Sequence, residues 1–99
     1  MIVLTGTIRI PADKLDQARP LMKTVIEETR KEDGCLFYSF GEDVLDPGLI
    51  VIAEAWRDEA AVRAHLGAAH FIAWRDAGAA LGVSDRQLTV YEAVSSKPL

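Results

Sequence analysis

The chain has 99 residues, of which 49% are hydrophobic and 26% are charged, and its formal net charge is −4. This length and composition predict a single domain over residues 1–99, built around one core. The acidic balance argues against a nucleic acid or an anionic membrane as the main partner, because an acidic surface gains no counterion release there.

The start of the chain lacks the basic and apolar run of a secretory leader, and no apolar run approaches the ~20 residues of a membrane span. We therefore expect a cytoplasmic protein with no membrane partner. Cys35 is the one cysteine, so an internal disulfide is excluded. Without a basic neighbour in sequence, Cys35 is expected to be a small buried hydrophobe rather than a nucleophile.

Alternating apolar residues predict a first strand over residues 2–10, with Gly6 leaving a gap on its apolar face. That face carries Ile2, Leu4, Ile8 and Ile10. From Pro11 the apolar residues recur every three or four positions, which predicts a helix that ends near residues 30–31. Pro20 lies inside this helix, where the loss of one backbone hydrogen bond predicts a bend.

Two further strands are predicted over residues 35–40 and 49–56, joined as a hairpin by a turn at Asp46-Pro47-Gly48. The second of them is apolar on both faces, which favours a strand covered on both sides. The charged run at residues 30–33 is interpreted as a solvated helix end.

Residues 57–80 have a helical composition that Gly67 interrupts, so two consecutive helical pieces are predicted. Their expected core contacts are Val62 and Leu66 in the first piece, and Phe71 and Trp74 in the second. A fourth alternating strand follows over residues 87–94.

The resulting order, β-α-β-β-α-β, predicts an α+β fold of the ferredoxin-like type, an antiparallel sheet with its helices on one face. The other face still carries several apolar side chains. An apolar face without cover predicts a homodimer formed through the sheet faces.

Four short stretches occur in this order along the chain: EDGCLFYSF at 32–40, Glu54-x-Trp56, AHL at 64–66 and HF at 70–71. On these residues the chain resembles the antibiotic biosynthesis monooxygenase superfamily of dimeric α/β-barrels, most closely its small quinol monooxygenase-like branch. The resemblance implies oxidation of a quinol or anthrone by molecular oxygen, with no flavin, haem or metal as cofactor.

Both histidines of the chain fall in this region, and we assign them a candidate catalytic role. His65 and His70 are five residues apart, whereas a helical zinc pair prefers four, so no metal site is predicted. An imidazole, with a pKa of about 6.5 in water, suits the removal of a phenolic proton. The alternative for each histidine is a hydrogen-bonded structural role.

Trp56 is the third candidate catalytic residue, and it shares a strand face with Glu54, so both point toward the helices or both toward the partner subunit. The candidate substrate-binding residues are Tyr38, Glu54, Phe71, Trp74 and Thr7. The alternative for the aromatic residues is a plain core position. The chain contains no asparagine, so the amide that the resemblance implies in the cavity has no counterpart, and Thr5, Thr7 or a histidine would replace it.

Together with the resemblance, these residues lead us to expect a homodimer whose apolar pocket binds a small aromatic substrate and molecular oxygen. A second interpretation is a dimer that binds or senses a small aromatic metabolite without converting it. A third is haem binding through one histidine, which predicts a Soret band on addition of haem.

Overall fold

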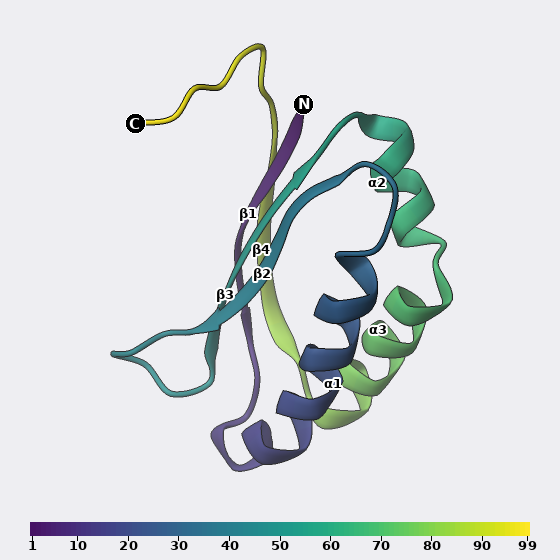
Figure 1. The fold of residues 1–99 in the computed structure, drawn as a ribbon. Coiled ribbons are helices and arrows are strands. Elements are labelled where there is room, and N and C mark those ends of the chain that lie inside the picture. The colour runs from purple at the N-terminus through teal and green to yellow at the C-terminus, as the bar shows by residue number, and fades with distance from the viewer.

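The computed structural model describes all 99 residues, and its elements follow the predicted order (Figure 1). The strands are β1 (Ile2–Arg9), β2 (Cys35–Glu42), β3 (Leu49–Trp56) and β4 (Ser84–Glu92). The helices are α1 (Leu15–Thr29), preceded by the 3-10 turn η1 (Ala12–Lys14), then α2 (Glu59–Leu66) and α3 (Ala69–Leu81).

The four strands form one antiparallel sheet in the order β2-β3-β1-β4, and all three helices lie on the same face of it (Figure 1). This is the ferredoxin-like α+β fold that the sequence predicts. None of the three helices combines the length and the apolar character needed to cross a bilayer.

The element boundaries agree with the sequence except at a few ends. β3 begins and ends where it was predicted, whereas β4 begins at Ser84, three residues before the predicted start, and ends at Glu92. Helix α1 runs unbroken through Pro20, which occupies its second turn.

The core lies between the helix-facing side of the sheet and the helices. Alternate residues of β1 and β3 point into it, as expected for strands with one covered face. Its main buried cluster consists of Ile8, Ile10, Leu15, Ala18, Met22, Val25, Ile50, Ile52 and Trp74. A smaller cluster at the other end of the sheet consists of Ile2, Tyr38, Trp56 and Ala61.

The predicted core contacts of α2 are correct for Val62, which packs against the smaller cluster, and wrong for Leu66. Ala61 and His65 are the buried residues of this helix, while Leu66 is 46% exposed and Val62 only partly buried. The residues of α2 that face the sheet are Ala61 and His65, which are four positions apart. Because histidine is polar, the prediction chose the apolar pair one position further along the helix. In α3, Trp74 is buried as predicted.

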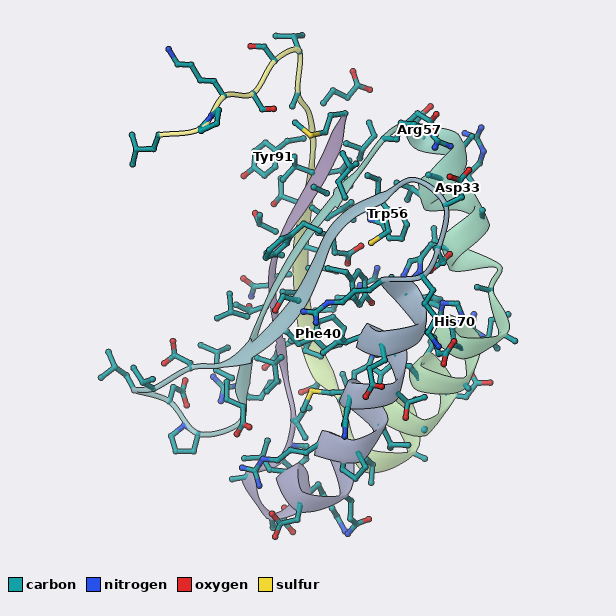
Figure 2. The ribbon with its side chains drawn as sticks, in the orientation of Figure 1. Asp33, Phe40, Trp56, Arg57, His70 and Tyr91 are labelled. Carbon is teal, nitrogen blue, oxygen red and sulfur yellow. The ribbon has the colours of Figure 1, made fainter.

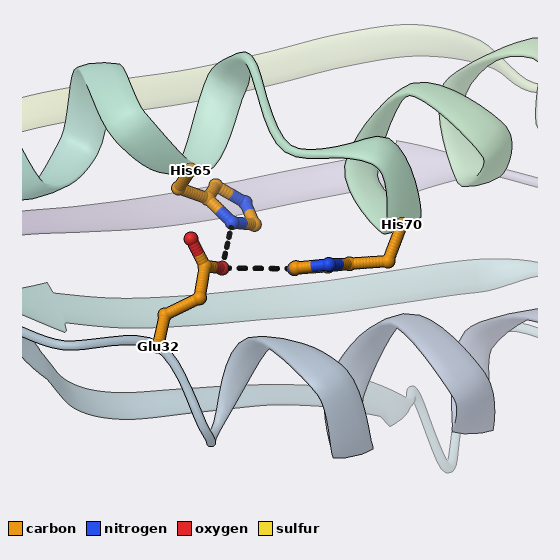
Figure 3. A group of neighbouring side chains, drawn as sticks. All are labelled: Glu32, His65 and His70. Carbon is orange, nitrogen blue, oxygen red and sulfur yellow. Dashed lines mark hydrogen bonds and ion pairs between the residues drawn. The ribbon is translucent and has the colours of Figure 1, made fainter.

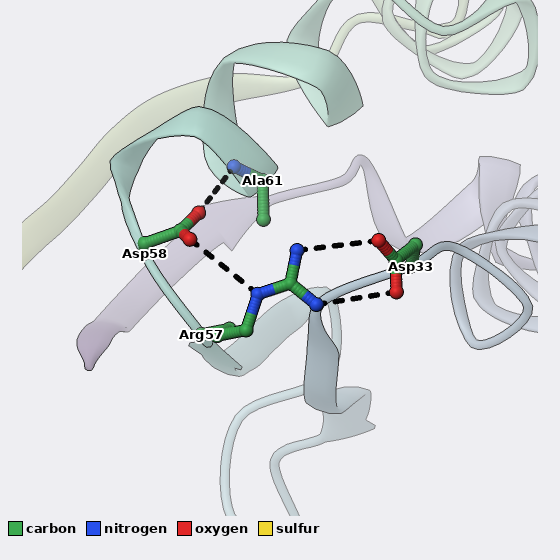
Figure 4. Close-up of polar contacts among 4 residues, drawn as sticks. All are labelled: Asp33, Arg57, Asp58 and Ala61. Atoms are coloured by element: carbon green, nitrogen blue, oxygen red, sulfur yellow. Dashed lines mark hydrogen bonds and ion pairs between the residues drawn. The ribbon is translucent and has the colours of Figure 1, made fainter.

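The loop before β2 is fixed against the start of α2 (Figure 4). The guanidinium of Arg57 donates to both carboxylate oxygens of Asp33, each at 3.2 Å, and Asp58 caps α2 by accepting from the Ala61 N–H at 2.9 Å. Gly34 has φ +86°, and a Cβ on it would lie 2.6 Å from that of Ala61. The loop and α2 are therefore in close contact.

The opposite face of the sheet has no helix over it. Strand pairing aligns Phe37, Ala55, Val3 and Tyr91 in one row across this face. Phe37 and Tyr91 are 54% and 51% exposed, and Figure 2 shows Tyr91 on the other side of the sheet from Trp56 and Phe40. An apolar row is thus open to solvent in the single chain.

Candidate functional site

A cavity of 420 Å³ lies between the helix-facing side of the sheet and helices α2 and α3. Its volume falls in the range of small-molecule sites, roughly 300–1,000 Å³. Most of its lining is hydrophobic: Leu4, Ile8, Tyr38, Phe40, Ile52, Val62, Leu66, Phe71, Trp74, Ala79, Val83, Leu88 and Val90. Among the predicted site residues, five line this cavity: Tyr38, Glu54, His65, Phe71 and Trp74.

The gap in the apolar face at Gly6 has a structural cause. A Cβ on this residue would lie 1.8 Å from the backbone oxygen of Gln87 in β4. Glycine is therefore required where β1 and β4 approach each other beside the cavity.

Glu54 and Trp56 both point toward the helices, which settles the orientation that the sequence left open. The side chains follow each other on the same face of β3, and the Trp56 indole Nε1 donates to Glu54 Oε1 at 2.9 Å. Trp56 is fully buried in the smaller core cluster and does not line the cavity. Burial raises the pKa of the Glu54 carboxyl, while this hydrogen bond and His65 act in the opposite direction.

His65 is 2% exposed and packs among aromatic rings. The ring centres of Trp56 and Phe71 are each 4.8 Å from that of its imidazole, and that of Tyr38 is 5.2 Å away. Its Nδ1 lies 2.6 Å from Glu32 Oε2, whereas its Nε2 is buried without any hydrogen-bond partner. Buried polar atoms without a partner are rare, and Thr29 Oγ1 is the other side-chain atom of this kind.

Glu32 was predicted to belong to a solvated helix end, and this is wrong. Only 15% of its side chain is exposed, because the loop that carries it is held against α2. The same Oε2 also lies 3.0 Å from His70 Nε2, so one carboxylate oxygen joins both histidines (Figure 3). His70 does not line the cavity and is 21% exposed at the start of α3.

Glu32, His65 and His70 also form a donor set that metal ions use, since two imidazoles and one carboxylate bind zinc in several enzymes. Their donor atoms lie within 4.8 Å of one another. Around a tetrahedral zinc with bonds of 2.0–2.1 Å, neighbouring donors are roughly 3.3 Å apart. Glu32 Oε2 lies at hydrogen-bond distance from both imidazoles, so the three side chains form a hydrogen-bonded cluster. They would have to move to coordinate a metal ion.

Thr7, like Trp56 and His70, lies outside the cavity lining, and Cys35 lies in an inert setting. Thr7 alternates with the inward-pointing Ile8, so its side chain belongs to the open face of the sheet, away from the cavity. Cys35 is partly buried, and burial together with the charges of Glu32 and Glu54 raises the pKa of its thiol. A raised pKa lowers the thiolate fraction, which agrees with the predicted inert role.

The polar rim of the cavity contains residues that the sequence analysis left unassigned, namely Arg75, Ser84, Asp85 and Arg86. Arg86 carried a usable signal, because it alternates with Leu88 and Val90 and so shares their face of β4. Beginning the predicted strand at residue 87 hid this relation. Glu32 had no comparable local signal, since its partners are 33 and 38 residues away.

The comparisons with known proteins agree with this fold. Residues 1–77 match the family model described as "Antibiotic biosynthesis monooxygenase". The chain is 30% identical over 98 residues to sll1783 of Synechocystis, an alignment that covers 99% of the chain and 67% of the relative. It is 32% identical over 71 residues to "Putative monooxygenase YcnE" of Bacillus subtilis, covering 72% of the chain and 75% of that protein.

Solved structures match over almost the whole chain. A crystal structure from Deinococcus radiodurans, which carries the same family description, superposes with a TM-score of 0.91 at 33% identity. That match covers 100% of this chain and 98% of the other. Rv0793 of Mycobacterium tuberculosis superposes with a TM-score of 0.83 at 26% identity and covers 98% of each chain. The chain therefore belongs to the antibiotic biosynthesis monooxygenase family.

Proposed function

We propose that this protein is a cofactor-independent monooxygenase that oxidises a quinol, an anthrone or a similar hydroxylated aromatic with molecular oxygen. The observation that carries the proposal is the imidazole of His65, which lines an apolar cavity with its Nε2 buried and unpartnered. Family membership supports monooxygenase chemistry, and the residues of the cavity support the substrate class.

His65 is proposed to act as the general base. The Glu32 carboxylate accepts the proton of Nδ1, so the neutral ring presents a bare Nε2 on its other side. A carboxylate that holds one nitrogen of an imidazole also stabilises the imidazolium that forms when the other nitrogen takes a proton. A phenolic hydroxyl bound in the cavity would lose its proton to Nε2.

The rest of the cavity suits an electron-rich aromatic anion. The rings of Tyr38, Phe71 and Trp74 provide flat apolar walls, and the guanidinium of Arg86 at the rim supplies positive charge. For a quinol, one oxygen atom enters the ring to give a hydroxyquinone and the other leaves as water. For an anthrone, one oxygen atom enters the ring as a ketone and the other leaves as water.

The working unit is proposed to be a homodimer formed through the open sheet faces. The row of Phe37, Ala55, Val3 and Tyr91 supports this arrangement, because a contiguous apolar surface is rarely left exposed in a monomer. Light scattering should give twice the chain mass, and Val3→Asp at the centre of the row should return the protein to a monomer. A monomeric wild-type protein would contradict this assembly.

The test of the function is oxygen uptake by metal-stripped protein with a panel of quinols and anthrones, corrected for autoxidation with heat-denatured protein. His65→Gln should abolish uptake above that background. Val90→Trp should do the same by filling the cavity, whereas Glu92→Trp should not. Glu92 lies on the same face of β4 but outside the cavity lining, which makes its variant the matched control.

Two outcomes would refute the proposal. Full uptake by His65→Gln would exclude His65 as the base. No uptake with any compound, together with saturable quenching of tryptophan fluorescence and recovery of the ligand unchanged, would establish a binding protein instead.

A further inference from the structure

The Glu32–His65–His70 cluster extends from the cavity to the protein surface. Side-chain exposure rises along it, from 2% at His65 to 15% at Glu32 and 21% at His70. The three side chains come from separate segments, namely the loop after α1, helix α2 and the first turn of α3 (Figure 3). The cluster is thus a hydrogen-bonded chain that leads outward from a buried ring.

The only hydrogen-bond partner of His65 is Glu32, because Nε2 has none and Nδ1 bonds only to the carboxylate. A proton that reaches the ring from the cavity has therefore two ways to leave. It returns to the cavity, or it passes through Glu32. Glu32 in turn bonds only to the two histidines.

We infer that Glu32 and His70 form the outer half of a proton path that connects the cavity-facing ring of His65 with water. This inference rests on the proposed role of His65 as the base. Neither Glu32 nor His70 lines the cavity, so both act through His65 as positioning residues rather than on the substrate.

The transfer is balanced without any redox partner. A substrate O–H bond breaks as the Nε2–H bond of His65 forms, and the Nδ1 proton of the same ring moves to Glu32 Oε2. From there it passes to His70 Nε2, which is bare in the tautomer protonated on Nδ1, and the partly exposed His70 ring releases its Nδ1 proton to water. The reverse sequence returns a proton to the cavity when the reduced oxygen needs one and restores the original tautomer.

The other ionisable groups around His65 offer no better route. Tyr38 on β2, Glu54 on β3 and Cys35 at the start of β2 all have raised pKa values, chiefly because they are buried. None of them is hydrogen-bonded to the imidazole. Glu54 is already engaged with Trp56.

The test needs no substrate, because the two imidazoles of the protein can be followed directly by ¹⁵N NMR. The measured quantity is the exchange rate of the His65 Nδ1 proton with water at low buffer concentration. His70→Gln is the decisive variant, since a glutamine amide can hydrogen-bond to Glu32 but cannot relay a proton. We expect exchange in His70→Gln to be about tenfold slower or more, with the tautomer of His65 unchanged.

Added imidazole should restore fast exchange in His70→Gln, because it can take the proton from Glu32 in place of the missing ring. Backbone amide exchange in α2 should be equal in both proteins, which excludes local opening as the cause. Equal Nδ1 exchange in wild type and variant would overturn the inference. So would a slowed rate that imidazole leaves unchanged, or a His65 ring whose Nδ1 carries no proton.

Oxygen uptake then separates this inference from the proposed function. If the function is correct, His70→Gln should lower kcat at low buffer concentration and recover with imidazole, while His65→Gln should not recover. If no compound supports oxygen uptake, the function fails, but the exchange measurements still decide whether the path exists.

Discussion

The hydrogen bond between Trp56 and Glu54 should make a large contribution to stability. Trp56→Phe keeps an aromatic ring in a fully buried position but removes the Nε1 donor that lies 2.9 Å from Glu54 Oε1. A hydrogen bond to a charged group contributes about 1.5–3 kcal/mol. The smaller ring adds about 1 kcal/mol for lost packing. The expected loss of about 2.5–4 kcal/mol is a large part of the roughly 5–15 kcal/mol that stabilises a domain.

The assay is urea denaturation followed by far-ultraviolet circular dichroism, in a double-mutant cycle. In a Glu54→Leu background the acceptor is absent, so Trp56→Phe should cost only the packing contribution, about 1 kcal/mol. Glu54→Gln is the matched control, because it keeps an acceptor oxygen in place. An equal cost of Trp56→Phe in the wild-type and Glu54→Leu backgrounds would refute this account of the pair.

The same variant should change how stability depends on pH. Burial raises the folded-state pKa of Glu54 above its ordinary value of 4.5, so the folded protein holds this proton more tightly than the unfolded chain does. The resulting stabilisation is complete below the ordinary value and is lost as pH rises through the folded pKa. The Trp56 hydrogen bond lowers that pKa, so Trp56→Phe should make stability fall over a wider range of pH. A pH profile parallel to that of wild type would contradict this.

Three further outcomes are expected. Gly6→Ala should lower the unfolding free energy in urea by about 1–3 kcal/mol, because the new Cβ would meet the backbone oxygen of Gln87, and unchanged stability would exclude this β1–β4 contact. Gly34→Ala should displace the loop and alter the imidazole NMR signal of His65, whereas Gly41→Ala, with open space around it, should not. Treatment with EDTA should leave Tm unchanged, and a Tm rise of several degrees with Zn²⁺ would show that the Glu32 cluster holds a metal.

The fold could be predicted because its signals are local. β3 was predicted to the residue, since its apolar run is bounded by the Asp46-Pro47-Gly48 turn on one side and by a helix-capping Asp58 on the other. β4 was placed three residues late because its first residues are polar and include Asp85 at φ 51°, which interrupts the alternation.

The site could be predicted only in part, because its decisive contacts are not local. Periodicity identifies which residues share a strand face, and this placed Glu54 beside Trp56 correctly. It could not reveal that Glu32 bonds to His65, because the loop that carries Glu32 is held toward α2 by contacts of Gly34 with Arg57 and Ala61, which are distant in sequence. The same contact explains why His65 is buried although its residue type is polar.

The Glu32–His65–His70 cluster forms only when the loop after α1, helix α2 and helix α3 are all in place. Helix α2 has eight residues, too few to persist without its tertiary contacts, so it should fray before the sheet unfolds. When α2 frays, His65 leaves Glu32 while the strands remain paired. Mild heating should therefore break the His65–Glu32 hydrogen bond in an otherwise native molecule. The NMR signals of the two imidazoles should change before those of the sheet.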